Sequence, residues 1–128
     1  MSSIAQPLRI AIIGSRSWTD EGAIYRYIGE LRFCGVSVEV VSGGARGVDS
    51  IVENACHLER IPIKVFPANW TKYKKSAGFI RNSEIVSYAD FCVAFWDGKS
   101  RGSADTIWKF QQKGKPTTII PPRSRDDG

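Results

Sequence analysis

Residues 42–50, SGGARGVDS, combine glycines with an arginine and an aspartate directly after an apolar run. Glycines at a strand-to-helix turn allow an anion to approach backbone amides that have no partner inside the helix. Arg46 can add a charge-assisted bond to a phosphate, and Asp49 can complement the helix dipole or accept a ribose hydroxyl. This loop alone fits phosphate or nucleotide binding and a tight turn with Asp49 as a helix-start residue equally well; three such loops at one edge of a sheet would favour binding.

Two more loops share this composition, GSRSWTD at residues 14–20 and WDGKSRGSAD at residues 96–105. Arg81 and Asn82 add a polar pair at the start of a further predicted helix, where a solvated helix face is the alternative. The candidate ligand-binding residues are Gly14, Ser15, Arg16, Ser42, Gly43, Gly44, Ala45, Arg46, Gly47, Asp49, Arg81, Asn82, Asp97, Gly98, Ser100, Gly102 and Ser103.

The elements that must position these loops follow from the apolar pattern. Short apolar runs rich in β-branched residues predict strands at residues 8–13, 36–41, 61–66, 90–96 and 116–120. Apolar residues at helical spacing lie between them, with Thr19 or Asp20 as the first helix cap and a less regular third helix within residues 77–88. Strands that are apolar throughout belong to a parallel sheet covered on both faces. We therefore predict an α/β fold, a Rossmann-like three-layer αβα sandwich with a mainly parallel five-stranded sheet of order 3-2-1-4-5.

This strand order has a consequence for the three loops. The chain reverses direction between the first and fourth strands, and ligands of open α/β sheets bind outside the carboxyl ends at that point. All three loops follow strands at this edge, so we expect them to surround one site.

Bulk properties narrow the class of protein. The chain has 128 residues, 42% hydrophobic and 24% charged, which fits one globular domain at residues 8–121 with flexible ends at 1–7 and 122–128. No apolar run approaches the ~20 residues of a membrane helix, and the start lacks a signal-peptide pattern. Three cysteines without metal-type spacing predict free buried thiols in the cytoplasm and no metal site.

Charge and aromatic residues leave two interpretations open. The net charge of +5 is modest, and part of it lies in TKYKK at residues 71–75, which is a solvated loop or a nucleic-acid surface. Trp18, Trp70 and Trp96 lie in or beside the candidate loops and either stack on a base or pack on the core. Trp108, at helical spacing, is predicted to be in the core.

Two common nucleotide motifs are absent. The GGARG segment does not match the G-x-G-x-x-G of dinucleotide folds and follows the second strand rather than the first. The GKS at residues 98–100 resembles the end of a Walker A loop, but Val93 stands where that loop has its first glycine. An ATPase is therefore excluded.

The segment SGGARGVDSIVENA resembles the glycine-rich segment of bacterial DNA-processing (Smf) proteins, which bind single-stranded DNA, and that of Lonely Guy cytokinin-activating enzymes. The segment from Ile80 to Pro121 resembles the same group, the SLOG superfamily of Rossmann-like domains, so the similarity spans Leu8 to Pro121. The GSR after the first strand is most similar to the YspA/YpsA-related stand-alone branch. The resemblance implies a nucleotide or nucleotide-derived ligand, no required cofactor and a homodimer.

The resemblance also implies two alternative functions. In the Lonely Guy enzymes an arginine and a glutamate serve cleavage of the base–ribose bond; Arg81 matches the arginine, and Asp105 stands near the glutamate. The Pro-Gly-Gly that opens their second motif is missing here. Nucleoside monophosphate hydrolysis by Arg81 and Asp105 is thus one alternative to ligand binding, and single-stranded DNA binding is another.

Overall fold

The computed structural model describes residues 6–45 and 47–122. These residues form a five-stranded parallel sheet of order β3-β2-β1-β4-β5, which confirms the predicted fold and strand order. Arg46 and most of the predicted flexible ends lie outside the described residues. The strands are β1 (Leu8–Gly14), β2 (Val38–Ser42), β3 (Ile63–Val65), β4 (Phe91–Phe95) and β5 (Thr117–Ile120).

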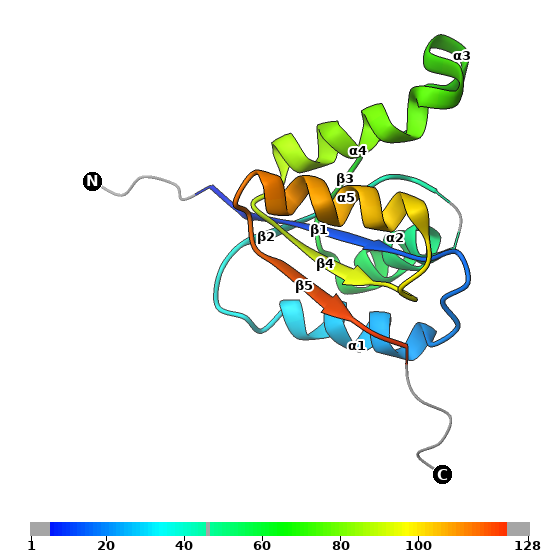
Figure 1. Cartoon of the computed structure of the whole chain (residues 1–128). Coiled ribbons are helices and arrows are strands. Elements are labelled where there is room, and N and C mark those ends of the chain that lie inside the picture. The colour runs from blue at the N-terminus through cyan, green and yellow to red at the C-terminus, as the bar shows by residue number, and fades with distance from the viewer. Residues whose placement is uncertain (1–5, 46, 123–128) are drawn as a thin grey trace.

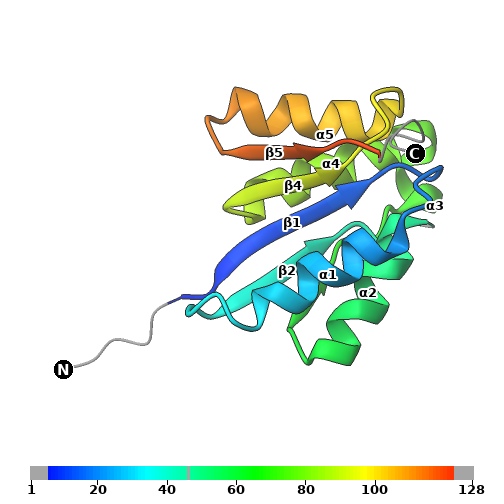
Figure 2. The same cartoon turned by 90° about the horizontal axis from the view of Figure 1, so that it is seen from below.

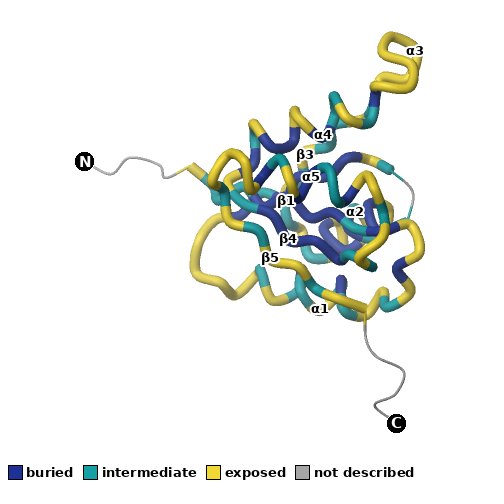
Figure 3. Tube along the Cα trace, viewed as in Figure 1, coloured by how far each residue is buried: buried dark blue, intermediate teal, exposed yellow. Residues whose placement is uncertain are grey.

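Helices cover both faces of the sheet (Figures 1 and 2). One face packs on α1 (Glu21–Leu31) and α2 (Val48–Glu59), and the other packs on α4 (Ala77–Tyr88) and α5 (Arg101–Gln112). Ile12 of the central strand faces the first helix pair and Ile13 faces the second, because successive side chains of a strand point to opposite faces. Figure 3 shows the resulting buried central strands between the helix layers.

Side chains fix several helix ends. Asp20 is the N-cap of α1, and its carboxylate accepts a hydrogen bond from the amide of Ala23 at 3.2 Å. At the other end of the molecule, Lys115 Nζ donates to the carbonyl oxygens of Val86 at 2.6 Å and Ala89 at 2.8 Å. The ammonium group thereby stabilises the C-terminal end of α4, where carbonyl groups have no helical partner.

Three local features differ from the sequence predictions. Residues predicted as a basic loop form a short helix, α3 (Trp70–Tyr73), and a 3-10 turn, η1 (Lys74–Ser76), which project from the start of α4 (Figure 1). The placement of Trp108 in the core was wrong, because Ile107 and Phe110 fill the sheet-facing side of α5 and leave Trp108 58% exposed. Cys34 is exposed, whereas Cys56 and Cys92 are buried as predicted.

No helix among the described residues is both long and apolar enough to cross a membrane.

Candidate ligand-binding cavity

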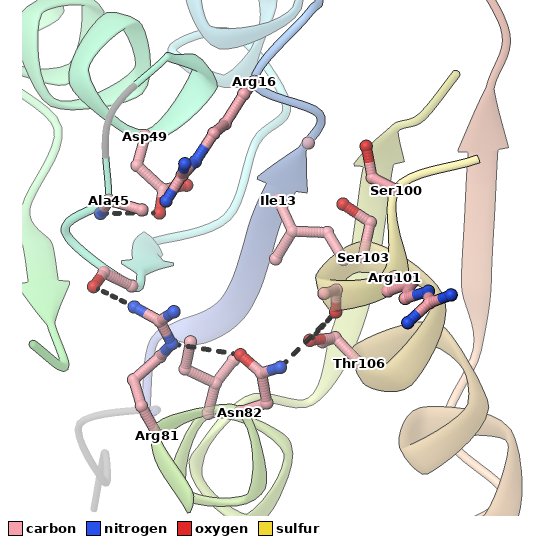
Figure 4. Close-up of a pocket in the computed structure, with 14 residues that line it drawn as sticks. Ile13, Arg16, Ala45, Asp49, Arg81, Asn82, Ser100, Arg101, Ser103 and Thr106 are labelled. Atoms are coloured by element: carbon pink, nitrogen blue, oxygen red, sulfur yellow. Dashed lines mark hydrogen bonds between the residues drawn. The ribbon is translucent and has the colours of Figure 1, made fainter. Parts of the chain in front are cut away.

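A cavity of about 360 Å³ opens at the carboxyl edge of the sheet, between the end of β1, the β2–α2 loop, α4 and the start of α5 (Figure 4). It lies where the strand order reverses between β1 and β4, as the topology predicts. It is lined by Ile13, Gly14, Arg16, Gly43, Ala45, Asp49, Arg81, Asn82, Ile85, Ser100, Arg101, Gly102, Ser103 and Thr106.

The structure brings most of the predicted site residues to this cavity. Those that do not line it are Ser15, Ser42, Gly44, Gly47, Asp97 and Gly98, and Arg46 lies outside the described residues. The cavity also includes four residues that the sequence interpretation missed. Arg101 could have been found, since it stands between two candidates, whereas Ile13, Ile85 and Thr106 carry only the ordinary pattern of core residues.

The glycines of the β2–α2 loop make room for the protein's own atoms. A Cβ on Gly43 would lie 2.7 Å from Nη1 of Arg81, and one on Gly47, whose φ is +80°, would lie 3.1 Å from the Cα of Arg16. By contrast, nothing lies within 4 Å of the corresponding position on Gly102. The loop glycines therefore have a packing role. Of the three glycines that line the cavity, only Gly102, at the start of α5, has free space where a side chain would begin.

Asp97 holds two loops together instead of facing the cavity. Its carboxylate accepts hydrogen bonds from the amides of Lys99 at 2.7 Å and Ser100 at 2.9 Å and from the hydroxyl of Ser17 at 2.8 Å. Its own amide donates to Ser15 Oγ at 2.9 Å. The amide donors, with smaller help from the hydroxyl, hold the pKa of Asp97 well below its usual range. This network fixes the start of α5 against the β1–α1 loop.

The first turn of α5 faces the cavity with unused hydrogen-bonding capacity. Ser100 is the N-cap, but its side chain does not cap a backbone amide of the helix. Ser103 is only 6% exposed, and its side chain lines the cavity. In Figure 4 the Ser103 hydroxyl points into the cavity. Free amides, a helix dipole and a buried hydroxyl together suit an oxyanion.

The charges around the cavity are mainly positive. Arg16, Arg81 and Arg101 line it, and Asp49 is the one carboxylate among its described lining residues. Burial raises the pKa of Asp49 to about 6, although the Ala45 amide and Arg81 oppose this shift. The arrangement favours an anionic ligand.

The two residues predicted to be catalytic lie in one hydrogen-bonded chain. Arg81 Nε donates to Asn82 Oδ1 at 3.0 Å, and Asn82 Nδ2 donates to Asp105 Oδ2 at 3.1 Å. The same Asp105 oxygen lies 2.8 Å from Lys109 Nζ. Arg81 lines the cavity, whereas Asp105 stands behind Asn82. Their catalytic roles stay predictions.

Comparison with known proteins identifies the family. A model of the YspA, cpYpsA-related SLOG family matches residues 8–73, and the chain belongs to this family. It is 36% identical over 115 residues to the Gene 61 protein of Mycobacterium phage D29, an alignment that covers 84% of this chain and 92% of that protein. The resemblance to the SLOG superfamily and its YspA/YpsA-related branch is confirmed.

Solved structures share the fold. DNA processing protein A of Streptococcus pneumoniae superposes with a TM-score of 0.76 at 19% identity, covering 94% of this chain but 52% of that protein, so the chain spans about half of its length. DNA processing protein A of Helicobacter pylori, which binds single-stranded DNA, gives 0.67 at 25% identity over 93% and 67% of the two chains. The molybdenum cofactor binding protein of Rippkaea orientalis gives 0.71 at 15% identity over 92% and 78%.

Proposed function

We propose that this protein binds a nucleotide or nucleotide-derived ligand, with its phosphate at the first turn of α5. The observation that carries the proposal is the first turn of α5, where the Ser103 side chain faces the cavity and the side chain of the N-cap Ser100 caps no backbone amide. The first amides of a helix have no partner inside it and attract phosphate oxygens, and a serine hydroxyl beside them supplies one more donor.

The size and charge of the cavity support this proposal. A volume of about 360 Å³ lies within the range of small-molecule sites and suits a ligand of nucleotide size. Arg16, Arg81 and Arg101 line the cavity and give it a positive potential that favours a phosphate-bearing ligand. Two proteins that share the fold bind single-stranded DNA and a molybdenum cofactor.

Calorimetric titration with AMP, ADP-ribose, NAD and cyclic nucleotides tests the proposal. We expect binding of at least one of them, and Ser103→Ala should weaken it at least about tenfold, since a hydrogen bond to a charged group contributes about 1.5–3 kcal/mol. Ser87→Ala is the matched control, because Ser87 is an exposed helical serine on α4 outside the cavity. The absence of heat with all four at millimolar concentration would contradict the proposal.

A second candidate function is single-stranded nucleic-acid binding by the segment 70–83, which we call the basic arm. The basic arm contains no aspartate or glutamate. Trp70 is 58% exposed and Phe79 is 52% exposed, and the neighbouring Lys72 and Lys75 are also exposed. Interleaved aromatic and cationic side chains suit stacked bases and a phosphate backbone.

Gel shifts with a labelled oligonucleotide at two salt concentrations test this candidate. Lys75→Gln should weaken binding and reduce by about 0.7 the steepness with which log affinity falls against log salt concentration. Lys113 is an exposed lysine after α5, and Lys113→Gln should change neither quantity. Trp70→Ala should weaken binding at both salt concentrations, because loss of stacking on one base costs about 1–3 kcal/mol. Equal shifts for all variants would eliminate the basic arm as the binding surface.

A further inference from the structure

We propose that Asp49 accepts hydrogen bonds from the sugar hydroxyls of the ligand, so that the cavity takes ribonucleotides in preference to deoxyribonucleotides. This inference rests on the proposed function.

Asp49 has unused acceptor capacity at the cavity. It lies in the first turn of α2, is 9% exposed and lines the cavity. The amide of Ala45 donates to its Oδ2 at 2.9 Å, and the amide of Gly43 makes a weaker contribution. A carboxylate offers about four acceptor positions, so these amides leave room for donors from a ligand.

A bound ligand must satisfy this carboxylate. Filling the cavity removes the water that reaches Asp49, and a buried carboxylate without hydrogen bonds is costly. A phosphate cannot serve, because both groups are anionic. The part of the ligand beside Asp49 must therefore carry hydrogen-bond donors and no negative charge.

The placement of the two ends of the cavity selects the kind of donor. Figure 4 shows Asp49 and Ala45 on one side of the cavity and Ser100, Arg101 and Ser103 on the other. In a nucleotide the sugar is bonded directly to the phosphate. If the phosphate lies at the first turn of α5, the sugar is therefore the next group on the way across the cavity to Asp49. Its vicinal 2′- and 3′-hydroxyls are neutral donors that one carboxylate can accept together.

Titration of the full chain with matched ligands tests the inference. We expect AMP to bind about tenfold or more tightly than 2′,3′-dideoxy-AMP, and ribose 5-phosphate to bind more tightly than 2′-deoxyribose 5-phosphate. The second pair lacks a base, so it separates recognition of the sugar from recognition of base N–H groups. Asp49→Asn keeps the size of the side chain and should reduce both preferences at least several-fold.

Glu30→Gln is the matched control, since Glu30 is an exposed carboxylate on α1 outside the cavity; it should leave both preferences unchanged. Equal binding of the hydroxylated and deoxygenated ligands by the unmodified protein would overturn the inference and leave the proposed function standing. Preference for AMP without preference for ribose 5-phosphate would also overturn it, in favour of base recognition. No binding of any ligand would instead contradict the proposed function.

Discussion

Arg81 occupies the space where a side chain on Gly43 would begin. Its Nη1 donates to the Gly43 carbonyl oxygen at 2.5 Å and lies 2.7 Å from the position of a Cβ on that glycine. This contact joins α4 to the β2–α2 loop and forms one wall of the cavity. This wall can form in this way because Gly43 has no side chain that would displace Arg81.

Gly43→Ala should displace Arg81 and weaken ligand binding. The added methyl would also lie about 3 Å from Arg81 Cδ, so the side chain would have to shift away from the loop. We expect at least a tenfold loss of affinity for the best nucleotide. The free energy of unfolding should fall by at most about 1.5 kcal/mol, the value of the displaced Arg81–Gly43 hydrogen bond, because the clashing atoms are the far end of a flexible side chain. Calorimetric titration and urea denaturation measure the two effects.

Gly102→Ala is the contrasting change. Nothing lies within 4 Å of the new methyl, and alanine favours a helix over glycine by up to about 1 kcal/mol, so the protein should be as stable or slightly more stable. Affinity should nevertheless fall, because Gly102 lines the proposed phosphate end of the cavity. Undiminished affinity in this variant would argue against a phosphate at α5.

Asp49 should make stability fall as the pH rises. Its pKa is about 6 in the folded chain, above its ordinary value of 3.8, so the folded state holds the proton more tightly. The protonated Asp49 carboxyl therefore adds about 3 kcal/mol to the free energy of unfolding. This stabilisation is fully present below about pH 4 and is lost as the pH rises through 6. The difference in unfolding free energy between the unmodified chain and Asp49→Asn, measured by urea denaturation from pH 4 to 7.5, should show this decline. A difference independent of pH would contradict it.

Lys115 should stabilise the fold without affecting the site. Lys115→Met removes the ammonium bonds to Val86 and Ala89 at the end of α4, and should lower the unfolding free energy by about 1.5–3 kcal/mol. Lys113→Met, at an exposed position nearby, should change it by less than about 0.5 kcal/mol. Equal denaturation midpoints for the two variants would show that this helix cap contributes nothing.

The cysteines should differ in reactivity toward a thiol reagent. Cys34 is exposed and should react rapidly in the native protein. Burial raises the pKa of the Cys56 thiol to about 12 and raises that of Cys92 as well, so neither forms a thiolate at neutral pH. Cys34→Ser should abolish the rapid phase, and urea should expose the other two thiols. A rapid phase that persists in Cys34→Ser would contradict this assignment.

Much of the fold could be predicted because its causes are local. Strands that are apolar throughout predict a parallel sheet, and caps such as Asp20 mark where its helices begin. Right-handed crossovers then favour one strand order. The same order predicts the edge where the cavity lies. The roles of Gly43 and Asp97 could not be predicted, because each depends on a contact with a residue distant in the sequence, Arg81 and Ser17. Trp108 was misplaced because helical spacing alone does not distinguish the centre of a buried face from its margin.

The cavity walls come from two sides of the central strand: the β2–α2 loop belongs to the first half of the chain, and α4 and α5 belong to the second. Neither half contains a complete site. A chain divided between β3 and α3 would consequently yield two fragments that capture ligand only after they reassociate, and the ligand itself would favour their reassembly.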